Sequence, residues 1–173
     1  MGKTVIQFIL MFIIMVLAQI IIFNHLCLFN VATPLLFIYF IIKLPFSLNL
    51  NWLITLSFFI GFIIDIFSDT YGTHALSCTI ISVLKRPIFK LYTPNDETFS
   101  NIQPSIKTLG FSVYCKYVIT FSIFYSFVLF IIEAFTFFNP LLLIIKIISS
   151  AILTSTLIIG IDSIISRQRE KRL

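Results

Sequence analysis

Charged side chains are scarce in this sequence, which holds 12 Lys and Arg and 7 Asp and Glu among its 173 residues. They make up 11% of the chain, against about a quarter of an average soluble domain. Apolar residues reach 59%, and the mean hydropathy is +1.08. The core of a water-soluble domain of this length cannot bury so many apolar residues. The chain is therefore expected to be an integral membrane protein, with lipid as part of its solvent.

The sequence also lacks the patterns that mark common catalytic and binding sites. Its three cysteines each stand alone, in or beside an apolar run, without CxxC or His pairing. It contains no phosphate-binding loop, no Ser/His/Asp pattern and no nucleic-acid motif. We therefore expect no enzymatic activity, no cofactor, no metal and no nucleic-acid partner. The formal charge of +5 is attributed to membrane topology and to anionic lipid.

Apolar runs divide the chain into six predicted helical spans within one transmembrane domain, residues 1–173. At about 20 residues per span, this length leaves room only for short connections. Pro34 is expected to kink the second span, and the first is expected to be retained, since it is too long for a signal peptide. The predicted fold class is an all-α, six-helix transmembrane bundle, with spans over about residues 5–23, 26–42, 52–67, 73–89, 111–132 and 140–165.

The fourth span is the least certain in length. Its apolar run, 74–84, would cover only about 16 Å as a helix, which is too short for a bilayer core. Extending the helix over 73–89 would let Lys85 and Arg86 reach the membrane interface with their charged ends. Alternatively, the third and fourth runs form a re-entrant hairpin.

Positive charge is distributed unevenly over the two sides of this predicted bundle. Every Lys and Arg except Lys146 lies on the side of the two termini. The three connections on the other side hold Asp69 and Glu133 but no Lys or Arg. The positive-inside rule then places both termini in the cytoplasm.

Asp65 is the most informative residue, because a charge at the centre of a membrane helix costs about 2.5–3.5 kcal/mol. Gly61 precedes it by one helical turn, Ser68 follows by about one turn, and Gly72 closes the next connection. One interpretation is a polar lining that binds a partner or ligand between helices. The other is close helix packing with a carboxylate near the outer interface. We favour a structural or partner role.

A metal or acid/base cluster of Asp65, Asp69 and His74 is a weaker alternative, because the spacing has no metal-ligand pattern. His74 is expected instead to be a hydrogen-bonded residue that caps the fourth helix.

Charged residues in the last two spans suggest local contacts. Glu133 and Lys146 lie on the same side of the membrane and either form an ion pair or reach the interface independently. Asp162 can pair with Arg167 or Arg169. The sixth span also carries a stripe of small, weakly polar residues that is expected to pack inside the bundle: Ser149, Thr156, Gly160 and Ser163.

The segment from Gly61 to Leu76 reads GFIIDIFSDTYGTHAL, which has the form G-x-x-x-D-x-x-S-x-x-x-G-x-x-A-L. This motif resembles that of the bacterial rod shape-determining MreD family. The stretch 109–135 is similar to members from the Bacteroidetes lineage, and the length and basic tail also suit the family. The resemblance assigns the motif to a partner interface at Gly61, Asp65, Ser68, Gly72, Ala75 and Leu76.

The resemblance implies a non-enzymatic subunit of the cell-elongation machinery in the bacterial inner membrane. Its partners would be MreC and, through it, RodA, a class B penicillin-binding protein and MreB. It also implies a six-helix fold similar to the substrate-binding subunit of energy-coupling-factor transporters. Because a fold alone does not settle function, a small-molecule (vitamin-type) binding subunit of a transporter is the alternative.

Overall fold

The computed structural model describes residues 2–23, 33–93, 103–134 and 140–170 of the chain. This part of the chain is helical and contains no strand, as the sequence predicts. The helices are α1 (Gly2–Ala18), continued by a short π-helical stretch, η1 (Gln19–Phe23), then α2 (Ile38–Lys43), α3 (Leu50–Ser68), α4 (Thr73–Lys90), α5 (Ile106–Leu109), α6 (Phe111–Glu133) and α7 (Pro140–Glu170).

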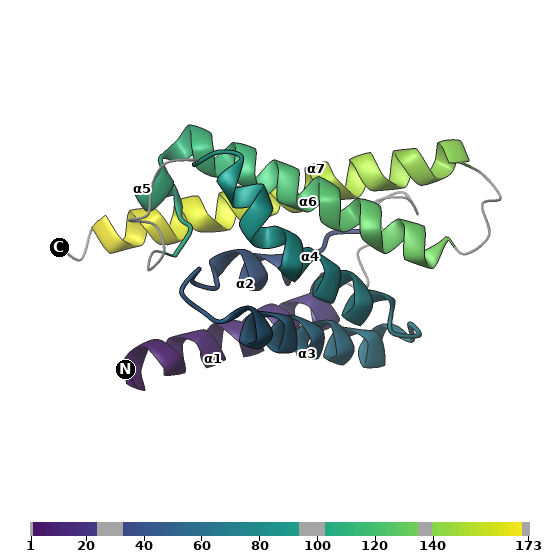
Figure 1. Cartoon of the computed structure of the whole chain (residues 1–173), viewed down its shortest axis with the longest axis horizontal. Coiled ribbons are helices and arrows are strands. Elements are labelled where there is room, and N and C mark those ends of the chain that lie inside the picture. Colours follow the sequence, from purple (N-terminus) through teal and green to yellow (C-terminus); the bar gives the residue numbers. More distant parts are fainter. Residues whose placement is uncertain (1, 24–32, 94–102, 135–139, 171–173) are drawn as a thin grey trace.

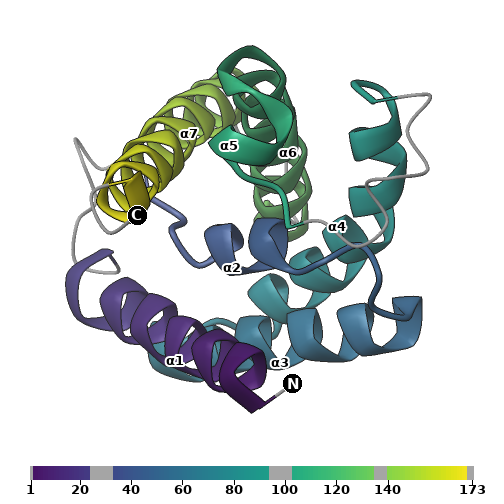
Figure 2. The same ribbon diagram turned by 90° about the vertical axis from the view of Figure 1, so that its left-hand side faces the viewer.

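The long helices form a bundle around the short helix α2. Both ends of the chain lie at the same end of the bundle, together with α5 (Figure 1). The turn between α3 and α4 lies at the opposite end, beside the last turn of α6 (Figure 1). Viewed along the bundle, α2 occupies the middle, with α1, α3, α4, α6 and α7 around it (Figure 2).

Three helices in the described residues are long and apolar enough to cross a membrane: α3, α6 and residues Pro140–Ile165 of α7. A shorter apolar stretch, Ile6–Ile21, lies in the first helical segment. Large apolar side chains cover the outer faces of these helices, for example Ile9 on α1 and Ile148 on α7, each 54% exposed. Apolar surface of this extent is typical of helices that face lipid.

The second predicted span is not a continuous helix where the structure describes it. Residues 33–35 lie outside any helix, a turn follows at 36–37, and α2 itself has only 6 residues. The prediction of a span over 26–42 is therefore wrong for 33–37, while 26–32 lie outside the described residues. Pro34 explains the break, because it has no N–H to donate and disfavours helical geometry in Thr33 before it.

The non-helical backbone is buried, and side chains from neighbouring helices satisfy its polar groups. The Leu35 N–H donates to Thr154 Oγ1 at 3.1 Å, and the Thr33 N–H donates to Ser150 Oγ at 3.1 Å. Gln19 accepts from the Leu36 N–H at 2.8 Å and donates to the Pro34 carbonyl at 2.9 Å. Irregular backbone at membrane depth is stable only with such internal partners.

The residues of α7 that face the inside of the bundle thus differ from the predicted stripe of small, weakly polar residues. The side chains turned inward are Ser150, Thr154, Ile158 and Asp162, which repeat every fourth residue and are at most 3% exposed. Thr156, Gly160 and Ser163 lie on the outer surface, and Ser149 is half-buried. The predicted packing stripe is therefore wrong, because the inner face is set by the partners it meets around residues 33–35.

The fourth helix has 18 residues, Thr73–Lys90, which agrees with the predicted extension over 73–89. It lies against α3 as an antiparallel pair (Figures 1 and 2). Lys85, however, is completely buried and does not extend to the surface.

Candidate functional site

The motif from Gly61 to Leu76 forms the corner between α3 and α4. Gly61 of α3 faces the backbone of α4 more closely than any other described glycine faces a neighbouring segment. A Cβ atom added at Gly61 would lie 2.6 Å from both Ala75 Cα and the His74 carbonyl oxygen. Real Cβ atoms essentially never approach other atoms so closely. Glycine at this position therefore lets α3 and α4 pack backbone to backbone.

Asp65 caps the first turn of α4 from the neighbouring helix. Its carboxylate is 4% exposed. Oδ1 accepts a hydrogen bond from the His74 N–H at 3.0 Å, and Oδ2 accepts one from the Ala75 N–H at 2.8 Å. The hydroxyl of Thr70 also donates to Oδ1. The first N–H groups of a helix have no partner within it and carry partial positive charge, so a buried carboxylate is stabilised there.

The connection between the two helices requires left-handed backbone at two positions. Asp69 has φ 56° and Gly72 has φ 80°. Ser68 is half-buried on α3, Ala75 is buried, and Leu76 is 51% exposed. The motif therefore builds the corner with Gly61, Asp65, Gly72 and Ala75, and leaves Leu76 on the outer surface.

His74 is hydrogen-bonded, as predicted, but its side chain does not cap α4. Asp65 caps α4, while the His74 ring nitrogen Nδ1 lies 3.2 Å from the Tyr125 hydroxyl of α6. Asp69 is exposed, so it does not join Asp65 in a buried cluster. In the described part of the chain no three His, Cys, Asp or Glu side chains converge as ligands for a metal ion.

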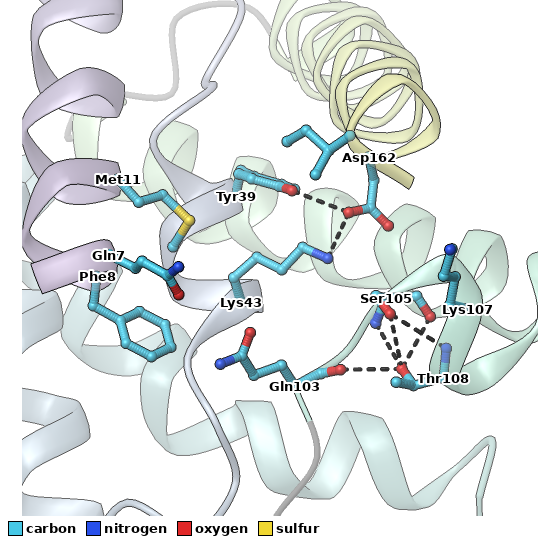
Figure 3. A pocket seen from close by; sticks show the side chains of 11 residues that line it. Gln7, Phe8, Met11, Tyr39, Lys43, Gln103, Ser105, Lys107, Thr108 and Asp162 are labelled. Atoms are coloured by element: carbon cyan, nitrogen blue, oxygen red, sulfur yellow. Dashed lines mark hydrogen bonds and ion pairs between the residues drawn. The ribbon is translucent and has the colours of Figure 1, made fainter. Parts of the chain in front are cut away.

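A second polar cluster lies at the opposite end of the bundle and joins segments far apart in sequence. Lys43, in the last turn of α2, forms an ion pair with Asp162 of α7, with Nζ 2.5 Å from Oδ1 (Figure 3). The Tyr39 hydroxyl donates to the same oxygen at 3.0 Å. Lys43 Nζ also donates to the Pro104 carbonyl at 2.8 Å. The cluster thus connects α2, α7 and the segment before α5.

Both charged residues of this cluster are buried. Lys43 is 8% exposed and Asp162 is 3% exposed. The Lys43 ammonium lies 5.4 Å from the centre of the Tyr39 ring and 5.5 Å from that of Tyr114, which suits cation–π attraction. Asp162 Oδ2 accepts from the Ile106 N–H at 3.0 Å. Buried charges are stable only with such dense pairing.

Sequence reasoning missed this cluster. It ended the second span at residue 42, before Lys43, and paired Asp162 with Arg167 or Arg169, whose side chains lie outside the described residues. The only signal was Asp162 itself, a carboxylate inside an apolar run. Its partner lies more than 100 residues earlier in the chain, so no helical spacing could identify it.

Lys85 has no carboxylate partner among the described residues and instead caps the end of α2. Its ammonium donates to the Ile41 carbonyl at 2.8 Å and to the Leu44 carbonyl. The last carbonyl groups of a helix lack partners within it and attract positive charge. The adjacent Arg86 donates to the Leu48 carbonyl at 2.7 Å. Together these side chains fix the connection between α2 and α3.

Lys85→Met is expected to lower the free energy of unfolding by about 1–3 kcal/mol, because two buried carbonyl groups lose their donor. Lys90→Met, an exposed position on the same helix, is the control and should stay within about 0.5 kcal/mol of the unchanged protein. Unfolding in mixed micelles, followed by helical circular dichroism, measures both. Equal stability of the two variants would mean that Lys85 does not hold α2.

For Glu133 and Lys146 the sequence left open an ion pair or two independent interfacial residues, and the structure shows no ion pair between them. Glu133 is exposed at the last residue of α6, and Lys146 is half-buried in α7. The ion pair in the described residues is Lys43–Asp162.

A cavity of about 500 Å³ opens beside the Lys43–Asp162 cluster. It lies between α1, α2, α5 and α7 (Figure 3). Its apolar lining residues are Phe8 and Met11 of α1 and Ile165 of α7. Polar groups form the rest: Gln7, Tyr39, Lys43, Gln103, Ser105, Lys107, Thr108 and Asp162. The volume lies within the range of small-ligand sites, although the lining is more polar than is usual for them.

Comparison of the chain with family models finds no match, and comparisons with curated proteins and with solved structures find none either.

Proposed function

We propose that this chain is a rod shape-determining subunit of the MreD kind, a non-enzymatic membrane scaffold of the cell-elongation complex that synthesises peptidoglycan. The observation that carries the proposal is the α3–α4 corner. Gly61, Asp65, Gly72 and Ala75 have direct roles in its geometry, and Leu76 is presented at its surface. Residues that the family motif holds together in sequence thus act as one structural unit in this chain.

The arrangement of the helices supports a six-span bundle with both termini in the cytoplasm of a bacterial cell, in its inner membrane. The two chain ends lie at one end of the bundle, together with α5 (Figure 1). An even number of crossings requires this placement of the termini. In this proposal α2 is the C-terminal part of a broken second span, and the fold is similar to that of vitamin-binding transporter subunits.

The surface around the corner offers a contact for MreC, a partner with a single span. Ile66 is 60% exposed and Leu76 is 51% exposed, while the Tyr71 side chain is fully exposed at the turn. A shallow hollow of about 340 Å³ lies between α3 and this turn. The other end of the bundle would face RodA, the class B penicillin-binding protein and MreB, which MreC brings to the complex.

Leu76→Ala is expected to reduce the amount of MreC that co-purifies with the chain by at least threefold, because an exposed leucine at a packed contact contributes about 1 kcal/mol or more. Leu91→Ala, 70% exposed at the other end of α4, is the matched control and should leave co-purification unchanged. Gly61 and Asp65 are unsuitable for this test, because replacing them disrupts the corner itself. Undiminished MreC capture by Leu76→Ala, or failure of the unchanged chain to capture MreC, would contradict the proposal.

The cavity beside Lys43 favours a second candidate, a small-molecule binding subunit of a transporter. Its volume of about 500 Å³ is large enough for a vitamin-sized ligand. A stoichiometric vitamin retained by the purified chain, or adjacent genes for a pair of transporter ATPases, would support this candidate. Adjacent genes for MreC, RodA and a penicillin-binding protein would support the scaffold instead.

A further inference from the structure

We infer that the outer face of α7 binds a transmembrane helix of another protein, and that this helix carries a carboxylate opposite Lys146. The contact is additional to the one proposed for MreC at the α3–α4 corner. Lys146 is half-buried and lies within Pro140–Ile165, the part of α7 that is long and apolar enough to cross a membrane. The adjacent Ile145 is 48% exposed, which is typical of lipid contact. A charged side chain within such a helix is costly and requires a partner.

The chain itself provides no carboxylate for Lys146 in its described part. The Lys146 side chain forms no ion pair and no hydrogen bond there. Asp65 is already bound by the first turn of α4, and Glu133 is exposed at the end of α6. The segments 24–32 and 135–139 contain no Asp or Glu in their sequence. The ammonium group of Lys146 is therefore available to a carboxylate from another molecule.

Small and weakly polar side chains continue along α7 on the same face as Lys146. Alternating steps of three and four residues, the spacing of a helix–helix seam, connect Lys146, Ser149, Leu153, Thr156, Gly160 and Ser163. This face is turned away from the bundle, because Thr156 and Gly160 are exposed and a Cβ atom added at Gly160 would meet no atom within 4 Å. In Figure 2, α7 lies on the outside of the bundle. Small side chains let a second membrane helix approach closely.

The charge of Lys146 decides between a second copy of the chain and a different partner. Two copies have the same orientation in the membrane, so pairing through this face would bring two Lys146 side chains to the same depth. Like charges at short distance repel each other strongly in a medium of low dielectric constant. A helix with Asp or Glu at that depth would form an ion pair instead. The partner is therefore a different membrane protein.

The test is Förster energy transfer in phosphatidylcholine vesicles between the labelled full chain and a labelled synthetic span. The probe is a polyleucine helix with glycine or serine at the same three- and four-residue steps and one glutamate at the depth of Lys146. Matched probes carry glutamine or lysine in place of the glutamate. We expect the glutamate probe to bind about fivefold more tightly than the glutamine probe, and the lysine probe to bind most weakly.

Substitutions in the chain test the two parts of the face separately. Lys146→Glu should reverse the preference, so that the lysine probe binds most tightly. Gly160→Leu should weaken binding of the glutamate probe about fivefold by preventing close approach. Ser112→Leu is the matched control, because Ser112 is a small exposed residue on α6, and it should leave binding unchanged.

Four outcomes would overturn the inference. They are equal binding of the glutamate and glutamine probes, an unchanged preference in Lys146→Glu, and equal effects of Gly160→Leu and Ser112→Leu. The fourth is stronger energy transfer between copies of the chain than to the glutamate probe, which would assign the face to a second copy. None of these measurements involves MreC, so their failure would leave the proposed scaffold function standing.

Discussion

Asp162→Ala is expected to lower the free energy of unfolding by about 3–5 kcal/mol, the typical cost of removing one partner of a buried ion pair. Lys43 is 8% exposed and would lose its carboxylate partner. The Tyr39 hydroxyl and the Ile106 N–H would lose their acceptor in the same step. Unfolding in mixed micelles, followed by helical circular dichroism, measures the loss.

A double substitution separates the ion pair from general damage to the core. Lys43→Met combined with Asp162→Leu removes both charges and should recover more than half of the stability lost by Asp162→Ala, since apolar replacements of buried ion pairs are often nearly neutral. Glu133→Ala, at an exposed carboxylate, is the control and should change stability by less than about 0.5 kcal/mol. A double variant as unstable as Asp162→Ala would mean that the pair does not organise this end of the bundle.

Gly61→Ala should have a comparably large effect, although it adds a single methyl group. The new Cβ would lie 2.6 Å from two backbone atoms of α4, Ala75 Cα and the His74 carbonyl oxygen. Backbone atoms cannot move aside as a flexible side chain does, so α3 and α4 must separate. Separation would also lengthen the hydrogen bonds that Asp65 accepts from the first turn of α4. We expect a loss of about 2–4 kcal/mol, combining overpacking with a weakened cap.

Gly160→Ala is the matched control for this substitution. Gly160 lies within helix α7, and a Cβ atom added there would meet no atom within 4 Å. The change should therefore leave stability equal or raise it by up to about 1 kcal/mol, because alanine favours helix more than glycine does. Similar unfolding curves for Gly61→Ala and Gly160→Ala would contradict the close approach of α3 and α4.

Features that depend on composition or on residues close together in the chain were predictable from the sequence. The excess of apolar residues over charged ones indicated a helical membrane protein, and the structure has three helices able to cross a membrane in its described part. The length of α4 followed from extending an apolar run. The importance of Asp65 followed from one carboxylate in an apolar helix, although its role as a cap did not. Its partners at His74 and Ala75 lie only 9 and 10 residues away.

By itself, the sequence thus determined that lipid is part of the solvent of this chain, that the chain is helical and that residues 61–76 form a corner. Composition and short-range spacing control these features. Only the tertiary structure decided the break before α2 and the ion pair of Lys43 with Asp162. The hydrogen bond from Tyr39 to Asp162 spans 123 residues, and the one from Leu35 to Thr154 spans 119. Such partners are selected by the packing of several helices at once. A buried polar group in an apolar run therefore indicates that a partner exists, while the fold determines which residue it is.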